Sequence, residues 1–189
     1  KAETLEFLSD LKANNTVEWV ELHKDRLTAA RTDFEETVDK IIKGLLEFDH
    51  HLLGLKARDC IFPQERNLEL SRFTDSYKTH LGAYIAMGGM KSDYAGYYIQ
   101  IQPGNSFLGG GMYAPASPVL RKIRQEIDFS PDELKAILNQ PSFQEEFGGL
   151  VDNQREGAPK GYPKDHRDID LLRYQGFFGI KEIDDEVPL

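Results

Sequence analysis

A short alternating stretch in the middle of the 189-residue chain constrains the fold more than any other segment. Positions 97–102 read Tyr-Tyr-Ile-Gln-Ile-Gln, so that one side of an extended segment would carry Ile99 and Ile101 and the other side two glutamines. This period of two residues is typical of a β-strand with one buried face. Pro103-Gly104-Asn105 supplies turn residues, and residues 106–113 can return as a second strand. The sequence therefore predicts an antiparallel hairpin.

Helical patterns precede this hairpin. Apolar residues from Leu27 to Leu46 recur every three or four positions with charged residues between them, which predicts an amphipathic helix with one buried face. Residues 5–11 have the same spacing, and Thr16 is expected to cap a second helical segment. Asp59-Cys60-Ile61-Phe62 is expected to be a strand, because its apolar residues follow a polar connection.

The segments after the hairpin are expected to be mostly helical. Ser117-Pro118 and Ser130-Pro131 each place a capping residue before a proline, which favours a helix start at both positions. A short helix around Phe143 is expected to end at Gly148-Gly149, and residues 165–173 also have helical character. Residues 177–183 are predicted to form an edge strand.

Helices and strands do not alternate regularly along this chain, which excludes a doubly wound parallel sheet and predicts the α+β class. We expect residues 1–189 to form one compact domain with an N-terminal helical arm, a central antiparallel hairpin or small sheet, and C-terminal helices.

Composition narrows the function classes. A net charge of −9 disfavours sequence-independent nucleic-acid binding, which depends on many Lys and Arg contacts to phosphates. No stretch approaches the roughly 18 uninterrupted apolar residues of a membrane helix, so a soluble protein without a membrane partner is expected. Cys60 is the only cysteine, which excludes an internal disulfide and suits the cytoplasm. We expect Cys60 to be a small buried residue rather than a reactive thiol.

Residues 71–80 gather cationic and aromatic side chains, and the Tyr- and Gly-rich residues 95–115 of the hairpin region follow them. Arginine offers a planar fork of donors and lysine a point charge, so a phosphate or carboxylate could bind here. The leading hypothesis is a small anionic ligand held by Arg72 and Lys78, with assistance from Tyr77, His80 and Tyr98. The alternative is that these cations pair with nearby aspartates and only pin the hairpin to the helices.

Two other classes of function stay open. An enzyme could use His80 or His166 as a general acid or base, because imidazole titrates near neutral pH. A protein interaction module would instead present the hairpin or an amphipathic helix to a protein partner. No motif identifies a reaction, a catalytic residue or a cofactor, and the histidine spacing matches no metal motif. Residues 109–111, all glycine, favour a bulge or a close strand crossing over an anion loop.

Several segments in a fixed order resemble a known protein family. They are Tyr77-Lys78-Thr79-His80, Ala95-Gly96-Tyr97-Tyr98, Gln102-Pro103-Gly104, Gly109-Gly110-Gly111 and Lys160-Gly161-Tyr162-Pro163. Together they resemble domain of unknown function family 2461, an uncharacterised bacterial family with the signature R-x-x-R-D-x-R-F-x-x-D-K-x-P-Y-K. Arg72-Phe73 and Tyr77-Lys78 match the ends of that signature, whereas Thr74-Asp75-Ser76 is shorter than its central part. The resemblance implies a bacterial protein and assigns no activity.

Overall fold

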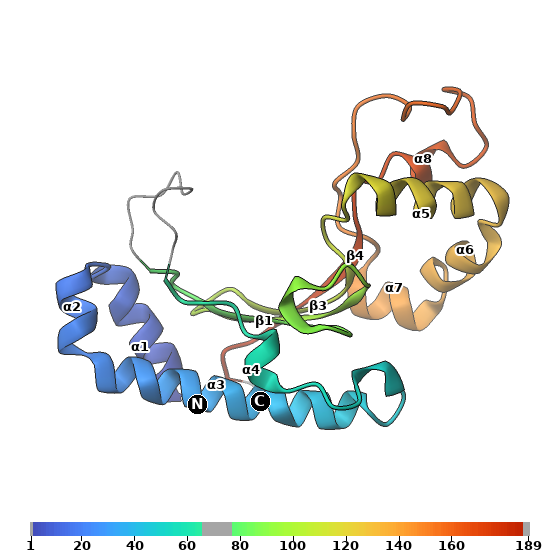
Figure 1. Ribbon diagram of the computed structural model, residues 1–189. Coiled ribbons are helices and arrows are strands. Elements are labelled where there is room, and N and C mark those ends of the chain that lie inside the picture. Colours follow the sequence, from blue (N-terminus) through green and yellow to red (C-terminus); the bar gives the residue numbers. More distant parts are fainter. Residues whose placement is uncertain (1, 66–76, 187–189) are drawn as a thin grey trace. The chain divides into compact units, whose positions relative to one another are not determined.

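The computed structural model describes residues 2–65 and 77–186. The chain divides into two compact units (Figure 1). The first unit comprises Lys1–Ser92, Gly96–Leu108 and Glu182–Leu189, and the second comprises Asp93–Ala95 and Gly109–Lys181.

The first unit begins with helices. They are α1 (Ala2–Ala13), α2 (Val17–Leu22), α3 (Lys24–Leu45) and α4 (Ala57–Cys60), with 3₁₀ turns η1 (His50–Leu52) and η2 (Gly89–Lys91). The predicted cap at Thr16 is confirmed, because its hydroxyl oxygen accepts a hydrogen bond from the Trp19 N–H at 3.2 Å. This bond satisfies one of the N–H groups that the first turn of a helix leaves without a partner.

A four-stranded antiparallel sheet follows, in the order β1-β2-β3-β4. Its strands are β1 (Leu81–Ile85), β2 (Gly96–Ile101), β3 (Ser106–Met112) and β4 (Phe177–Ile183). The predicted hairpin is confirmed as β2 and β3, and the predicted edge strand is β4. In the first pair, Ala83 lies opposite Ile99 and Gly82 lies opposite Gln100, so the two faces of β1 and β2 are chemically distinct.

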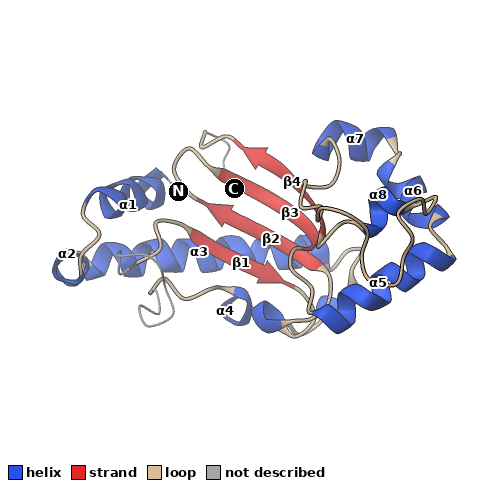
Figure 2. Ribbon diagram, turned by 90° about the horizontal axis from the view of Figure 1, so that it is seen from above, coloured by secondary structure: helices blue, strands red, loops and turns tan. Residues whose placement is uncertain are grey.

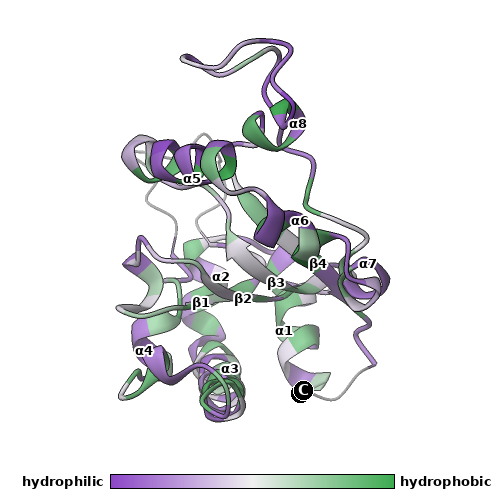
Figure 3. Ribbon diagram, turned by 90° about the vertical axis from the view of Figure 1, so that its right-hand side faces the viewer, coloured by the Kyte–Doolittle hydropathy of each residue, from purple (hydrophilic) through white to green (hydrophobic). Residues whose placement is uncertain are grey.

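Helix α3 lies against the face of β1, and α1 packs beside α3 on the same side of the sheet (Figures 2 and 3). The sheet side of this layer contributes alternate residues such as Ile85 and Ile99, both about 1% exposed, and α3 contributes Phe34 and Val38. These side chains belong to one buried apolar cluster that also contains Cys60. Burial of this cluster is the main favourable contribution to folding of the first unit.

Asn15 fastens the chain between α1 and α2 to the segment that precedes β1. Its side-chain amide donates to the Tyr77 carbonyl oxygen at 2.9 Å, and its Oδ1 accepts from the Tyr77 N–H at 3.0 Å. A single side chain thus satisfies both backbone groups of a residue 62 positions away.

The second unit contains the remaining helices. They are α5 (Ser117–Phe129), α6 (Asp132–Leu138), α7 (Pro141–Phe147) and α8 (Ile169–Leu172). The predicted stop of α7 is confirmed, since Gly148 follows it at a φ of +65°, in the left-handed region that favours glycine. The interpretation of residues 109–111 as a bulge or a close strand crossing is supported as well. A Cβ on Gly111 would lie 2.1 Å from the Phe177 carbonyl oxygen, so the close approach of these strands requires glycine there.

The predicted strand at residues 59–62 was wrong, and the helix predicted within residues 165–173 was confirmed only in part. Asp59 and Cys60 end helix α4, whereas Ile61 forms an isolated bridge to Ala83 and the Phe62 N–H donates to the Gly82 carbonyl oxygen of β1 at 2.9 Å. The segment is too short and too mixed for its period to separate a helix from a strand. Helix α8 occupies only part of the predicted residues 165–173, because turns precede it.

The expected serine caps do not form. Helix α5 is capped by Ala116 and already contains Ser117, while α6 is capped by Pro131, and neither start has a side-chain cap. The prolines fix the backbone for the first turn without that hydrogen bond.

The α+β prediction itself is confirmed by helices that accompany an antiparallel sheet. Within residues 2–65 and 77–186, no helix has the length and apolar character needed to span a membrane.

Candidate functional site

The face of β2 opposite the apolar core carries a polar and aromatic surface, which we call the Tyr98 face. It is formed by Phe62, Lys78, Tyr98, Gln100, Gln102 and Phe107. All six residues belong to the first unit. Alternation along β2 places Tyr98, Gln100 and Gln102 on one side of the strand, as the sequence pattern predicted.

Tyr98 lies at the centre of this face. Its ring centroid is 6.3 Å from that of Phe62 and 5.5 Å from that of Phe107. The ring also extends over β1, because a Cβ on Gly82 would lie 2.8 Å from the Tyr98 hydroxyl oxygen. Burial raises the pKa of Tyr98, so this residue remains a neutral phenol that donates a hydrogen bond.

The side chains of β2 form a hydrogen-bonded series with one direction. The Tyr98 hydroxyl donates to Gln100 Oε1 at 3.1 Å, and Gln100 Nε2 donates to Gln102 Oε1 at 2.8 Å. Gln100 is only 8% exposed, and its Nε2 also donates to the Asn105 carbonyl oxygen at 3.5 Å, which favours this orientation of the amide. Among the residues that the structure describes, none accepts a hydrogen bond from Gln102 Nε2. The series therefore ends in two amide N–H groups that can donate to a ligand.

Lys78 supplies the positive charge beside this series. Its Nζ lies 5.7 Å from the centroid of the Phe62 ring and donates to the Pro63 carbonyl oxygen at 2.7 Å. These contacts position the ammonium group next to the aromatic part of the Tyr98 face. The positive charge of Lys78 also contributes to lowering the pKa of Glu65.

Gln64 positions the backbone segment that contains Lys78 and His80. This residue is 2% exposed, and its Nε2 donates to the carbonyl oxygens of Lys78 and, at 3.1 Å, His80. The Lys78 N–H in turn donates to the Gln64 carbonyl oxygen at 2.9 Å. A buried amide thus holds the entry to β1 in one conformation.

The structure brings only some of the predicted site residues together. Lys78 and Tyr98 meet through the ring of Phe62, and His80 lies two residues beyond Lys78 on the same clamped segment. Tyr77 instead belongs to the apolar cluster, with 9% of its surface exposed. Arg72 lies outside the described residues, so its predicted role stays a prediction.

His166 belongs to a hydrogen-bonded network of the second unit. Its Nδ1 accepts from the Asp168 N–H at 3.1 Å, and its Nε2 lies 3.0 Å from Asp128 Oδ1. The first contact places the proton of neutral His166 on Nε2, which then donates to Asp128. Both ring nitrogens of His166 therefore have hydrogen-bond partners. This arrangement is consistent with a role in orienting the start of α8. Its role as a general acid or base stays a prediction.

Asp168 is the most buried carboxylate of this network. Its side chain is fully buried and forms ion pairs with Lys135 and with Arg167, whose Nε lies at 3.0 Å. The two cations lower the pKa of Asp168, with the hydrogen bond from Lys135 as the largest cause. Asp168 therefore stays ionised and ties the chain before α8 to α6.

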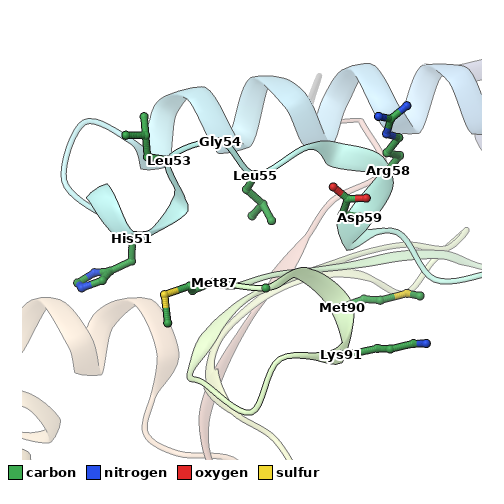
Figure 4. A pocket seen from close by; sticks show the side chains of 10 residues that line it. His51, Leu53, Gly54, Leu55, Arg58, Asp59, Met87, Met90 and Lys91 are labelled. Carbon is green, nitrogen blue, oxygen red and sulfur yellow. The ribbon is translucent and has the colours of Figure 1, made fainter.

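A separate hollow of about 530 Å³ lies between the α3–α4 connection and the turn after β1 (Figure 4). Its charged lining residues are Arg58, Asp59 and Lys91, with His51 nearby. Arg58 and Lys91 leave the backbone in different directions, while Met87 points toward His51 (Figure 4). The charged side chains of the hollow therefore do not converge on one point.

The surroundings of Cys60 and of the potential metal ligands favour a structural role for these side chains. Cys60 is buried, as predicted, and burial together with nearby aspartates raises its pKa to about 11. The thiol is therefore protonated at neutral pH and a poor nucleophile. In residues 2–65 and 77–186, no three His, Cys, Asp or Glu side chains gather as potential metal ligands.

The comparison with protein families, like the geometry of the site, identifies no chemical reaction. A family model described as conserved hypothetical protein (DUF2461) matches residues 3–189. The chain belongs to this family. The match covers nearly the whole chain, as the ordered segments of the sequence indicated. No curated protein and no solved structure matches the chain.

Sequence reasoning missed three glutamines that organise the site. Gln100 and Gln102 were visible as the polar side of the alternating stretch, and their spacing of two residues is the signal that could have identified them. Gln64 left no comparable signal, because its partners are backbone carbonyl groups 14 and 16 residues away.

Proposed function

We propose that this chain binds a small hydroxylated anion on the Tyr98 face. The observation that carries the proposal is the directional series that ends at the amide of Gln102, next to a lysine and three aromatic rings. Lys78 pairs with a phosphate or carboxylate group of the ligand, and Gln102 donates to one of its oxygen atoms. The rings contact the apolar side of the ligand.

The hydroxyl groups of the ligand follow from the other end of the series. The Tyr98 oxygen donates its proton to Gln100 and keeps lone pairs that can accept from a ligand hydroxyl. A ligand with acceptor oxygens at one end and a hydroxyl at the other satisfies both ends. Sugar phosphates, sugar acids and hydroxy acids have this pattern, whereas simple apolar carboxylates lack the donor.

The aromatic residues of this face favour a small ligand over a protein partner. Phe62, Tyr98 and Phe107 are half-buried, whereas the strongly exposed apolar side chains of the chain lie elsewhere. Protein interfaces are built around larger contiguous apolar patches. The proposal also places the protein in the bacterial cytoplasm, where small phosphorylated and carboxylated metabolites are abundant and the thiol of Cys60 stays reduced.

A thermal-shift screen tests this function. The intact protein is heated with inorganic phosphate, sugar phosphates, sugar acids and simple carboxylates in separate samples. A ligand at 100 times its dissociation constant stabilises the native state by about 2.7 kcal/mol. That stabilisation raises Tm by several degrees for a chain of this size. The proposal expects a shift from hydroxylated anions and a smaller shift from the unhydroxylated carboxylates.

Three variants assign the shift to the Tyr98 face. Lys78→Ala, Gln102→Leu and Tyr98→Phe each remove one proposed contact and should weaken binding about tenfold, the effect of losing one hydrogen bond to a charged or polar ligand group. Lys91→Ala is the matched control, since it removes an exposed lysine of the same unit outside this face. Equal shifts in all four variants, or no shift from any compound, would refute the proposal.

A further inference from the structure

Three arginines of the second unit lie around the end of α8, although they are far apart in sequence. Arg124 comes from α5, Arg155 from the connection after α7, and Arg173 follows α8 directly. None of the three makes an ion pair with a carboxylate in the part of the chain that the structure describes.

Arg124 is fixed by backbone carbonyl groups. Its Nε donates to the Leu172 carbonyl oxygen at 2.8 Å, and its Nη2 donates to the Tyr174 carbonyl oxygen at 3.0 Å. These contacts satisfy carbonyls at the C-terminal end of α8 and use two of the five guanidinium donors. The half-buried Arg124 thus has a fixed orientation and retains Nη1 for another acceptor.

Arg155 and Arg173 face each other across a short antiparallel ladder. The Arg155 N–H donates to the Arg173 carbonyl oxygen at 3.0 Å, and Arg173 Nε donates to the Arg155 carbonyl oxygen at 3.1 Å. The next residues along the ladder, Gln154 and Tyr174, form an isolated antiparallel bridge. Because Tyr174 also binds Arg124, the three arginines share one small backbone scaffold.

Like charges are close together on this scaffold. Burial lowers the pKa of Arg124, and the positive charge of Arg155 lowers it further. Tyr162 also lies near Arg124, and the neighbouring Asp128 is engaged by His166. The positive charges of Arg124 and Arg155 repel each other, and a bound anion would reduce that repulsion.

We infer that Arg124, Arg155 and Arg173 form an anion-binding site in the second unit, and that its ligand is a phosphate group of a small molecule. Guanidinium groups match the oxygens of phosphate with paired, parallel hydrogen bonds. The fixed orientation of Arg124 and the short ladder supply the preorganisation that lowers the entropic cost of binding. This site is independent of the Tyr98 face.

The test uses the full chain labelled with ¹⁵N and the Nε–Hε signals of its arginines. Inorganic phosphate and pyrophosphate are titrated at pH 7, with potassium chloride at matched ionic strength as the reference. Saturable shifts of the signals of Arg124, Arg155 and Arg173 with phosphate, but not with chloride, are expected. Shifts that grow linearly and equally in both titrations would show only general screening and overturn the inference.

Two charge-matched variants make the result specific. Arg155→Gln removes an exposed arginine and should weaken phosphate binding about tenfold, while Tm without phosphate stays unchanged. Arg121→Gln removes an exposed arginine from α5 and should change the affinity less than twofold. Equal affinities in both variants would overturn the site. Lys78→Ala should leave this titration unchanged, so that failure of this site and failure of the Tyr98 face are separable.

Discussion

The two units of this chain are stabilised by different interactions. The first unit surrounds an apolar cluster of eighteen buried residues. In the described part of the second unit, the buried apolar side chains are Ile127, Leu172 and Phe178. The fully buried Asp168 and its cations lie in that unit instead. We therefore expect acid and salt to lower the free energy of unfolding of the second unit. Loss of apolar volume should lower the free energy of unfolding of the first unit.

The largest expected effect comes from the apolar cluster. Phe34 on α3 is 2% exposed, so Phe34→Ala should lower the free energy of unfolding of the first unit by about 4 kcal/mol, through lost transfer energy and an unfilled cavity. Urea unfolding followed by the fluorescence of Trp19 measures this loss, because Trp19 is the only tryptophan and lies in the first unit.

The control for this substitution is Phe129→Ala. Phe129 is 86% exposed at the end of α5, so its removal should change the free energy of unfolding by less than about 0.5 kcal/mol. Similar losses in both phenylalanine variants would contradict the assignment of stability to the buried cluster.

The second effect concerns the ion pairs of Asp168. Asp168→Asn leaves Lys135 and Arg167 without their buried carboxylate and should destabilise the second unit by about 2 kcal/mol, because both cations can partly return to water. Hydrogen exchange of the α8 amides should become faster, while exchange in α3 stays unchanged. Asp170→Asn, an exposed carboxylate of the same helix, is the control. Faster exchange in α3 as well would show that the units unfold together.

Asp168 also determines the direction in which the stability of the second unit changes with pH. The pKa of Asp168 is lower in the folded state than its ordinary value, so its stabilisation is complete above the ordinary pKa. That stabilisation is lost as the pH falls through the lowered pKa. Exchange in α8 should therefore accelerate in strong acid before the fluorescence of Trp19 changes, and a simultaneous change would contradict the comparison of the units.

The third effect is on the rate of a chemical reaction. The pKa of about 11 leaves roughly one hundredth of the thiolate that the ordinary value of 9.0 would give near pH 8. Alkylation of Cys60 by iodoacetamide should therefore be at least about 100-fold slower in the folded protein than in urea. A ratio near one would mean that the first unit opens often.

The smallest effect is expected at the surface. Lys181 and Glu146 form an ion pair in which both side chains are about half exposed. Lys181→Ala should therefore lower the free energy of unfolding by less than about 0.5 kcal/mol, and less still in high salt. Urea titrations at low and high salt measure it, and a loss similar to that of Asp168→Asn would remove the distinction between buried and exposed pairs.

The fold could be predicted where a local signal and the tertiary structure agree. The alternation of residues 97–102 specified β2, the hydroxyl of Thr16 capped α2, and Gly148 ended α7. Ser117, the first residue of α5, and Ser130, which precedes α6, gave the same kind of signal without forming the caps. A capping residue predicts a helix start only within one or two positions, because prolines can set the first turn alone.

The candidate site was less predictable, because its contacts join residues distant in sequence. Lys78 and Tyr98 were named from composition and do meet on one face, whereas Tyr77, next to Lys78, lies in the core. Asp168 is buried, while Asp165 and Asp170 nearby are exposed, and nothing in their sequence context distinguishes the three. Burial of a polar group depends on tertiary partners that periodicity does not encode.

The paired hydrogen bonds of Asn15 require an amide, because the same side chain donates one of them and accepts the other. Hydrolysis of this one amide to a carboxylate would replace the donor that serves the Tyr77 carbonyl with a second acceptor. Two oxygen atoms would then face each other, at a join that links α1 and α2 to the segment before β1. The chemical ageing of a single asparagine would thus loosen the helical arm without breaking the chain.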